Sequence, residues 1–254
     1  MPKGLQAKGL ARRDKMLLAA ITHFLADGYE KTTTASIAKA AGMSASSFFA
    51  AFETKEALLL LLVKHMFSNQ FNEIFSIIGS SAEPVMIYAA ETSLQLYLSE
   101  LSEPLRELYV TAYSLPTTSE FIYQNTAKEL EQFFAPYNPG SSSRDFYELE
   151  IASAGIMRGF MAKPCDVYFT MNDKLRRFLS CCFTLYHVPQ SLDRINALVK
   201  LLRFGILDIT GINISGCFHL NTDRLSFQIV QRTDLIRLSA AACKQHTNRK
   251  QQYP

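Results

Sequence analysis

Between residues 28 and 58, the sequence combines a helical stripe, a glycine and a group of small hydroxyl side chains. The stripe has the spacing i, i+3, i+4 and i+7 and consists of Thr34, Ile37, Ala38 and Ala41. Gly42 then ends this helix, and Ser44 can cap the next one. A second helix that starts so soon after a glycine, with small polar residues ahead of a buried aromatic residue, can enter a DNA major groove. The pattern predicts a helix-turn-helix.

Reactive residues elsewhere are too scattered to form a catalytic or metal site. The five histidines show no HExxH or similar spacing, and the five cysteines form neither paired CxxC knuckles nor an even disulfide framework. Cys181 and Cys182 are adjacent, but neighbouring residues of a helix point in different directions, which disfavours a redox switch. There is no nucleophile elbow or phosphate-binding loop either. The sequence therefore predicts no enzyme, no metal and no cofactor.

Positive charge gathers at the start of the chain. Residues 1–65 hold nine Lys or Arg and five Asp or Glu, a net charge of +4, which leaves the remainder near −1. A basic segment on a nearly neutral body suits contact with phosphates at one end. For Lys3 and Lys8 alone, a solvated, disordered arm over residues 1–11 is the simpler interpretation.

Size and hydropathy indicate a globular protein with more than one part. The chain has 254 residues, above the roughly 100 to 200 of a usual single domain, and 48% of them are aliphatic or aromatic. It has no uncharged apolar run of about 18 residues, and its basic start is not followed by a signal-type cleavage pattern. We therefore expect a cytoplasmic protein that has no membrane partner.

Apolar periodicity predicts an all-α fold with two structured domains. A first helix over about 12–26, stopped by Gly28, supports the helix pair and completes a three-helix domain at 12–58. A long helix capped by Thr54 then runs to about residue 78. Further helices are expected at about 83–101, 103–115, 118–134, 144–161, 170–186 and 191–209, with the clearest loop at 135–143. Residues 59–210 should thus form an antiparallel helical body.

The pattern becomes ambiguous after residue 210. Residues 217–227 could be extended, and residues 234–244 could form one more short helix. The polar end, residues 244–254, is expected to be disordered. Residues 211–254 therefore remain an extension without an assigned role.

The helix-turn-helix segment resembles the TetR family of bacterial transcriptional regulators over about residues 12–58. The matching residues are Ala20, Phe24, Gly28, Tyr29, Thr32, Thr33, Ile37, Ala38, Ala41, Gly42, Ser44, Phe48, Phe52, Lys55 and Glu56. The body is also similar to the family's regulatory domain, in particular over residues 105–113. The resemblance implies a homodimer that binds double-stranded DNA at a near-palindromic operator, and a small-molecule effector, bound in the body, that controls the spacing of the two DNA-binding domains.

Carried over by position, the resemblance assigns seven residues to DNA. Thr33 would touch a phosphate, Lys55 would pair with another, and three small residues would lie nearest the base edges. The full set is Thr33, Ser44, Ala45, Ser46, Ser47, Phe49 and Lys55. Hydroxyls and helix N-termini donate to phosphate oxygens, and small side chains let a helix sit deep in a groove. A purely structural interpretation makes Thr33 and Ser44 helix caps.

The chain departs from the family pattern on the second helix of the pair. The family usually has a tyrosine where this chain has Phe49, and often phosphate-binding residues where it has Ala50 and Ala51. Ser36 stands where an acidic residue would complete a capping box with Thr33. No Arg, Lys, Asn or Gln occurs over residues 44–52, so base reading would rely on hydroxyls, thymine methyl contacts and DNA shape.

The body contains many aromatic residues and one arginine in an apolar stretch, 151–161. The candidate effector contacts are Phe67, Tyr88, Tyr109, Tyr113 and Arg158. A cavity lined by such residues could hold an amphipathic acid or an aromatic molecule. The alternative is that the aromatics are packed core and the arginine pairs with a nearby acid.

The preferred hypothesis is a ligand-responsive repressor that dimerises through the last two body helices, 170–186 and 191–209. The alternative is a helical dimer of the same fold that has lost operator reading and acts through ligand or protein binding. The absence of base-reading side chains over residues 45–51 favours that alternative.

Overall fold

The computed structural model describes residues 3–67, 71, 83–189, 195–196 and 198–199, and their side chains from residue 9 onward. Within these ranges every regular element is helical, which confirms the all-α prediction. The helices are α1 (Lys3–Asp27), α2 (Thr34–Ala40), α3 (Ala45–Phe52), α4 (Lys55–Phe67), α6 (Pro84–Leu101), α7 (Glu103–Ala112), α8 (Pro116–Phe134), α9 (Ser143–Ala162) and α10 (Met171–Leu185), with a short 3-10 turn at Ala135–Tyr137.

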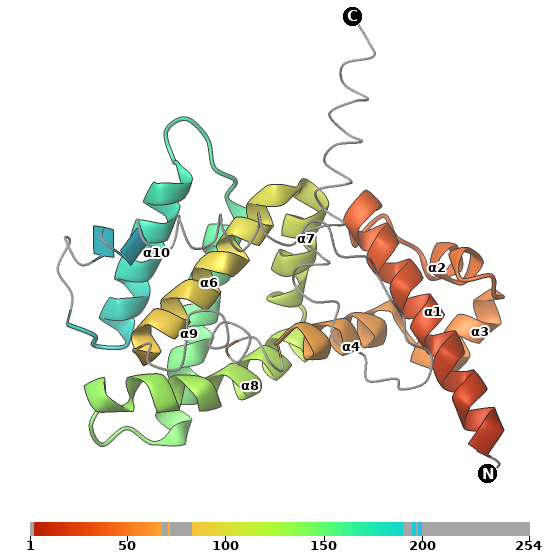
Figure 1. Cartoon of the computed structure of the whole chain (residues 1–254), viewed down its shortest axis with the longest axis horizontal. Helices are drawn as coiled ribbons and strands as arrows, with labels where there is room; N and C mark the ends of the chain where they lie inside the picture. The colour runs from red at the N-terminus through yellow and green to blue at the C-terminus, as the bar shows by residue number, and fades with distance from the viewer. Residues whose placement is uncertain (1–2, 68–70, 72–82, 190–194, 197, 200–254) are drawn as a thin grey trace, which may run out of the picture.

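Helices α1, α2 and α3 form a small head at one end of the molecule, and α4 leads from it into the body (Figure 1). The head encloses apolar side chains from all three helices, including Leu17, Phe24, Ile37, Phe48 and Phe52. Two residues with positive φ, Gly28 (φ 87°) and Gly42 (φ 71°), end α1 and α2. Only glycine adopts such backbone angles without steric cost, so the chain reverses direction at these points.

The first helix is longer than the sequence pattern predicts. It begins at Lys3 rather than near Arg12, so residues 3–11 are helical and the expectation of a disordered arm over 1–11 is wrong for them. Gly4 and Gly9 each cost a helix about 1 kcal/mol relative to alanine. The intervening Leu, Gln, Ala and Lys residues are good helix formers, and they continue a helix that the head already stabilises further along.

Capping residues and prolines mark most of the remaining boundaries where the sequence predicts them. Thr54 Oγ1 accepts a hydrogen bond from the Ala57 N–H (2.9 Å), so it caps α4 as expected. Pro84 and Pro104 lie in the first turns of α6 and α7. Pro116 is the first residue of α8, which therefore starts two residues earlier than the predicted 118, and α7 ends at Ala112 rather than at the predicted 115.

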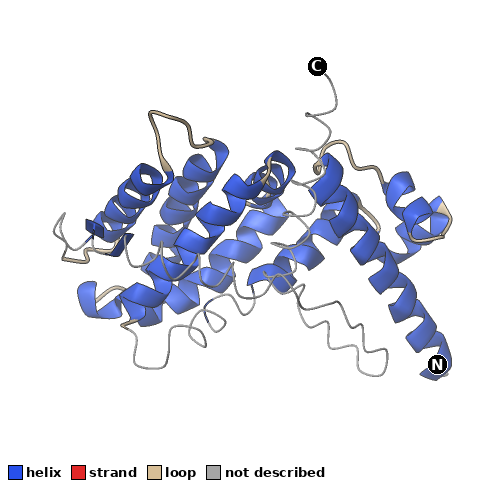
Figure 2. Cartoon of the chain, turned by 45° about the horizontal axis from the view of Figure 1, so that its top comes forward, coloured by secondary structure: helices blue, strands red, loops and turns tan. Residues whose placement is uncertain are grey.

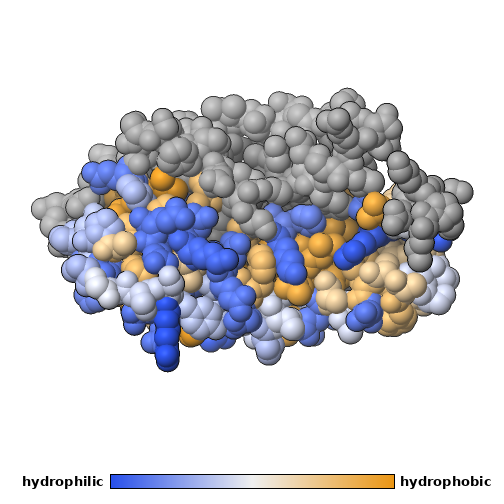
Figure 3. Space-filling view, turned by 90° about the horizontal axis from the view of Figure 1, so that it is seen from below, coloured by the Kyte–Doolittle hydropathy of each residue, from blue (hydrophilic) through white to orange (hydrophobic). Residues whose placement is uncertain are grey.

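The body is built from α4 and α6–α10, which lie side by side as a layered bundle (Figures 1 and 2). α8 packs along α9 and α4, α6 packs against α7, and α10 lies against α9 and α6. Large side chains fill the interior, among them the fully buried Tyr109, Phe134, Phe146, Phe178 and Tyr186. No helix within the described ranges has both the length and the apolar character needed to cross a bilayer. Hydrophilic residues alternate with hydrophobic patches on the face shown in Figure 3.

Several expected segments lie outside the described residues. These are the end of the α4 helix up to residue 78, most of the helix expected at 191–209, and everything assigned to 211–254.

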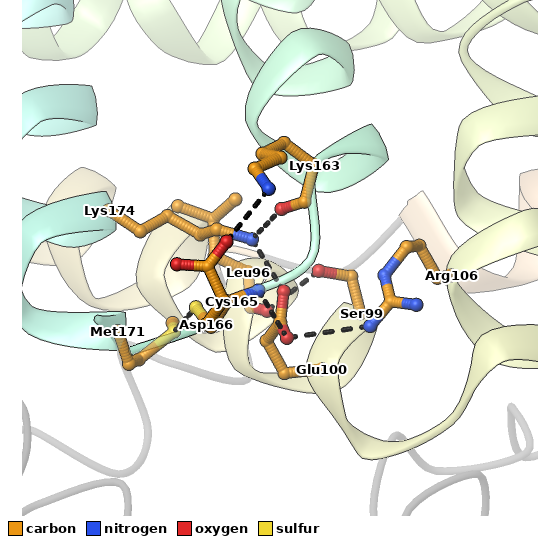
Figure 4. A network of polar contacts seen from close by, with 9 residues as sticks. All are labelled: Leu96, Ser99, Glu100, Arg106, Lys163, Cys165, Asp166, Met171 and Lys174. Atoms are coloured by element: carbon orange, nitrogen blue, oxygen red, sulfur yellow. Dashed lines mark hydrogen bonds and ion pairs between the residues drawn. The ribbon is translucent and has the colours of Figure 1, made fainter. Parts of the chain in front are cut away.

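A buried lysine ties α10 to the ends of α6 and α9 (Figure 4). Lys174 has no exposed side-chain surface, and its Nζ donates to Glu100 Oε1 and to the Lys163 carbonyl, each at 2.5 Å. Glu100 Oε2 accepts from the Cys165 N–H (3.1 Å) and from Arg106 (3.4 Å). Burial by itself raises the pKa of Glu100, but the hydrogen bonds from Lys174 and Cys165 outweigh it and hold that pKa below its usual value.

We expect Lys174→Met to destabilise the protein by about 2 to 3 kcal/mol, because it removes the cation from a buried pair and leaves the Lys163 carbonyl without this donor. Urea unfolding at neutral pH measures the effect. Lys163→Met is the control: its ion pair with Asp166 is exposed, and its loss should cost less than about 1 kcal/mol. Equal losses in the two variants would contradict the assignment of Lys174 as a structural anchor.

Candidate functional site

Helix α3 presents one face to the core of the head and the other to solvent. Phe48 (0% exposed) and Phe52 (3%) lie inside with their ring centroids 5.6 Å apart. On the opposite side, Ala45 and Ser46 are exposed, and Phe49 leaves 52% of its surface in solvent. The outer face of α3 therefore carries no charge, consists of small side chains apart from Phe49, and is open to contact.

Thr33 and Ser36 together cap the first turn of α2. Thr33 Oγ1 accepts a hydrogen bond from the Ser36 N–H (3.0 Å), and Ser36 Oγ accepts one from the Thr33 N–H (3.2 Å). The expectation that Ser36 leaves the capping box incomplete is therefore wrong, since a hydroxyl replaces the usual carboxylate. Thr33 is exposed and lies at the helix N-terminus, a position from which N–H groups and a hydroxyl can contact an anion.

Ser44 occupies the N-cap position of α3, but its hydroxyl makes no capping bond. Instead, Ser44 Oγ lies 2.9 Å from both Ser46 Oγ and Ser47 Oγ. The predicted side-chain cap is thus replaced by a cluster of three hydroxyls at the start of the helix. Each hydroxyl can still accept a further hydrogen bond, but these short contacts engage some of their donors with one another.

One exposed cation of helix α1 lies beside α3. Arg12, Arg13 and Lys15 are all exposed, and the Arg13 guanidinium lies 5.1 Å from the centroid of the Phe52 ring. This contact holds Arg13 against the end of α3 while its side chain stays exposed. The head therefore carries positive charge beside α3, although α3 has none of its own.

Lys55 lies at the start of α4 and binds the turn between α1 and α2. Its Nζ donates to the Tyr29 carbonyl (2.9 Å) and the Thr32 carbonyl (3.1 Å), and it lies 4.1 Å from the centroid of the Tyr29 ring. These contacts make it a structural link within the head. Its predicted pairing with a DNA phosphate stays a prediction, and would have to use the remaining proton of the ammonium group.

The aromatic residues predicted to contact an effector are all buried and form two groups. Phe67 and Tyr113 meet edge to face, with centroids 5.8 Å apart, whereas Tyr88 packs against Phe134 and Tyr186. Tyr109 is also fully buried. The structure thus brings Phe67 together with Tyr113, but places Tyr88 in a separate cluster of rings.

The fifth candidate, Arg158, does not belong to this interior. Its side chain is exposed on α9, between Met157, which is buried, and Gly159, which is exposed. The sequence pattern predicts an apolar stretch over 151–161 that only Arg158 interrupts. In the helix, however, Ile151 (42% exposed) and Arg158 share the outer face, so the proposed cation inside a cavity is not supported.

Several buried polar residues next to these aromatics escaped the sequence analysis. Tyr113 OH donates to Gln95 Oε1 (2.9 Å), and Gln95 Nε2 donates to Glu91 Oε2 (2.9 Å). On the other side of the body, Glu150 accepts a hydrogen bond from the Ser153 hydroxyl, which itself accepts one from Tyr186 OH (2.8 Å). Burial raises the pKa of Glu150 to about 8.

A sequence signal for Glu150 exists in the spacing of α9. Phe146, Glu150, Met157 and Met161 are all buried, and Glu150 occupies a position of the apolar stripe. An acid on an apolar stripe indicates a carboxyl group that is neutral or paired. No group of three or more His, Cys, Asp or Glu residues in the described part of the chain is arranged to hold a metal ion.

Comparisons with known proteins agree with this geometry. Residues 16–62 match the family model described as "Bacterial regulatory proteins, tetR family", which confirms the resemblance drawn from the sequence. The fold is similar to the crystal structure of RolR in complex with resorcinol (13% identity, TM-score 0.57), over 76% of this chain and 94% of RolR. It is also similar to Thermus thermophilus FadR, a TetR family transcriptional repressor in complex with lauroyl-CoA (19% identity, TM-score 0.52), over 70% of this chain and 96% of FadR. No curated protein matches the chain in sequence.

We expect Lys55→Met to destabilise the protein by about 1 to 3 kcal/mol, because two carbonyls lose a charged donor. Thermal and urea unfolding measure this, with the exposed Lys64→Met on the same helix as the control. A phosphate role predicts a different result: little change in stability, but weaker binding to every DNA sequence and a shallower dependence of affinity on salt.

We expect the stability of the protein to fall as the pH rises from about 4.5 to about 8. In the folded state Glu150 keeps a proton that the unfolded chain releases above about pH 4.5. The free energy of unfolding therefore decreases with rising pH until the pH reaches the raised pKa of about 8. Glu150→Gln should flatten this part of the profile of unfolding free energy against pH. The exposed Glu148→Gln on the same helix should leave the profile unchanged, and an identical slope in wild type and Glu150→Gln would refute the assignment.

Proposed function

We propose that this chain, whose residues 16–62 match the TetR family, is a ligand-responsive repressor that binds a near-palindromic operator as a homodimer. A small effector bound in the helical body releases it from DNA. The observation that carries the proposal is the outer face of α3, which is exposed along its length and carries only small side chains and Phe49. A helix of that shape fits into a major groove.

The supporting cations come from outside α3. Arg12, Arg13 and Lys15 are exposed on α1, and Arg13 packs over Phe52 at the end of α3. In this proposal these residues contact phosphates and provide the affinity that does not depend on sequence. Thr33 adds a hydroxyl at the N-terminus of α2, where it reaches a phosphate without leaving its capping position.

Sequence discrimination then comes from the hydroxyls of Ser46 and Ser47, from contacts of Ala45 and Phe49 with thymine methyl groups, and from DNA shape. No side chain from residue 44 to residue 52 can form a bidentate contact with a base edge. We therefore expect the protein to bind the operator only modestly more tightly than other sequences. In the homodimer, the free energies of binding to the two half-sites add.

The predicted dimer helices are 170–186 and 191–209, and we add α9, which packs against α10, to the proposed interface. α9 exposes a row of small residues, namely Ala152, Gly155, Gly159 and Ala162. A Cβ added to Gly155 or Gly159 would meet no atom within 4 Å, so a second helix has room to approach the backbone closely. α10 corresponds to the predicted dimer helix at 170–186, whereas most of 191–209 lies outside the described residues.

An effector site is best supported near Phe67 and Tyr113. There the aromatic rings adjoin Gln95 and Glu91, so the region offers both apolar surface and hydrogen-bonding groups inside the body. The two similar structures hold an aromatic diol and an acyl-CoA, respectively, which supports a small molecule with an apolar part as the class of effector.

One observation favours the alternative function, a helical dimer that acts through ligand or protein binding and no longer reads an operator. The Ser44 hydroxyl hydrogen-bonds to those of Ser46 and Ser47, Thr33 is bonded to Ser36, and Lys55 is engaged by two carbonyls. Five of the seven residues assigned to DNA thus already have partners within the protein.

Selection of bound duplexes from a random DNA pool by the purified full-length protein tests the proposal. We expect recovery of a near-palindrome that the dimer, verified by sedimentation, binds more tightly than a scrambled duplex. Arg12→Ala should weaken binding to both duplexes and reduce the slope of log affinity against log salt by about one, while the exposed body variant Lys128→Ala should not. An intact dimer that recovers no sequence would favour the alternative function.

A further inference from the structure

The turn between α1 and α2 is held by a residue of the body. Glu107, on α7, projects toward this turn, and its Oε1 accepts a hydrogen bond from the Glu30 N–H at 2.7 Å. The two residues are 77 positions apart in the chain, and α1 packs against α7. A charged acceptor makes this a stronger bond than a neutral one.

Gly28 makes this approach possible. A Cβ at position 28 would overlap Glu107 Oε2, and the backbone φ of 87° also favours glycine there. The carboxylate therefore occupies the space that any other residue at this position would fill. Gly28 thus ends α1 and also leaves room for the Glu107 carboxylate.

Helix α4 binds the carbonyl groups of the same turn. Lys55 donates to the Tyr29 and Thr32 carbonyls, while Glu107 accepts the N–H of Glu30, which lies between them. An anion from α7 and a cation from α4 therefore bind one short turn through its backbone. Because the turn leads directly into Thr33 and α2, its position determines where the helix pair begins.

Helix α7 also reaches the candidate effector region. Tyr113, its C-cap residue, contacts the Phe67 ring and donates to Gln95. Glu107 and Tyr113 are six residues apart, about 9 Å along a helix axis. A single short helix thus joins the proposed effector region to the turn that precedes the DNA-binding helices.

We propose that Glu107 is a positioning residue, through which a displacement of α7 is transmitted to the α2–α3 helix pair. The consequence for DNA rests on the proposed function, but the coupling itself does not. When α7 shifts, the carboxylate draws the Glu30 N–H with it or releases it, and the helix pair changes position relative to the body. Coupling of this kind requires an element with a different energy in the two positions, and the Glu107 hydrogen bond supplies that difference.

The first test is hydrogen exchange of the full-length protein without DNA. Glu107→Ala should speed exchange of the Glu30 amide by about tenfold and also that of residues 34–52, because the turn loses its contact with the body. Glu107→Gln, a milder change suited to the case in which the alanine variant is unstable, should have a smaller effect in the same direction. Glu103→Ala, an exposed glutamate on the same helix, should change neither segment.

Gly28→Ala should also break the hydrogen bond between Glu107 and the Glu30 N–H. Its methyl group would displace the Glu107 carboxylate, and the φ of 87° adds backbone strain, so it should speed exchange of the Glu30 amide at least as much as Glu107→Ala does. The double variant should then exchange at about the rate of the faster single variant rather than at the product of both effects. Fully multiplicative effects would show that the two residues act separately and would overturn the proposal.

The decisive test perturbs the far end of α7. Tyr113→Phe removes the hydrogen bond to Gln95, and in the wild-type background it should change exchange over residues 34–52 by about threefold or more. In the Glu107→Ala background that change should disappear. An equal change in both backgrounds would mean that Glu107 only supports the turn. Since no DNA is present, failure of the proposed operator binding cannot be mistaken for failure of this coupling.

Discussion

The burial of two phenylalanines fixes the geometry of the head. α3 has eight residues, too few for a helix to persist alone in water, so its position depends on packing. Phe48 and Phe52 place one side of α3 in the common core with Phe24 and Ile37. This orientation sends Ala45, Ser46 and Phe49 outward. The exposed surface of α3 is thus determined by which side chains the head must remove from water.

The body depends on buried polar groups as much as on apolar packing. Lys174 joins three helix ends through Glu100 and the Lys163 carbonyl, while Glu150 is buried beside hydroxyl groups and has a raised pKa. The two carboxyls differ because Glu100 has a cation beside it, whereas Ser153 and Tyr186 offer Glu150 only hydroxyls. The Lys174–Glu100 pair fixes the three helix ends relative to one another, whereas the buried Glu150 makes the stability of the body sensitive to pH.

Local signals in the sequence predicted the helical fold well. Gly28, Gly42, Thr54 and Pro104 mark boundaries through the backbone angles and hydrogen bonds that they permit, so those boundaries could be read without a structure. The start of α1 could not, because Gly9 weakens the helix signal while the neighbouring residues favour it only slightly.

The candidate site was less predictable, since its contacts join residues far apart in the sequence. Nothing in the local pattern indicates that Glu107 meets Glu30, or that Lys55 binds two carbonyls rather than water. The exposure of Arg158 was hidden for a related reason: a linear apolar stretch conceals which residues face outward once the helix turns. The family match covers α3 as part of residues 16–62, but the pairing of its serines appears only in three dimensions.

The small outer face of α3 also has an evolutionary consequence. Because Ala45, Ser46 and Ala50 are exposed, a substitution at any of them changes stability by only about 0.5 kcal/mol. Longer polar side chains could therefore arise there one at a time without disturbing the core that Phe48 and Phe52 anchor. Under the proposed function, single mutations at these positions would change the operator preference of descendants of this chain while the helical body stays the same.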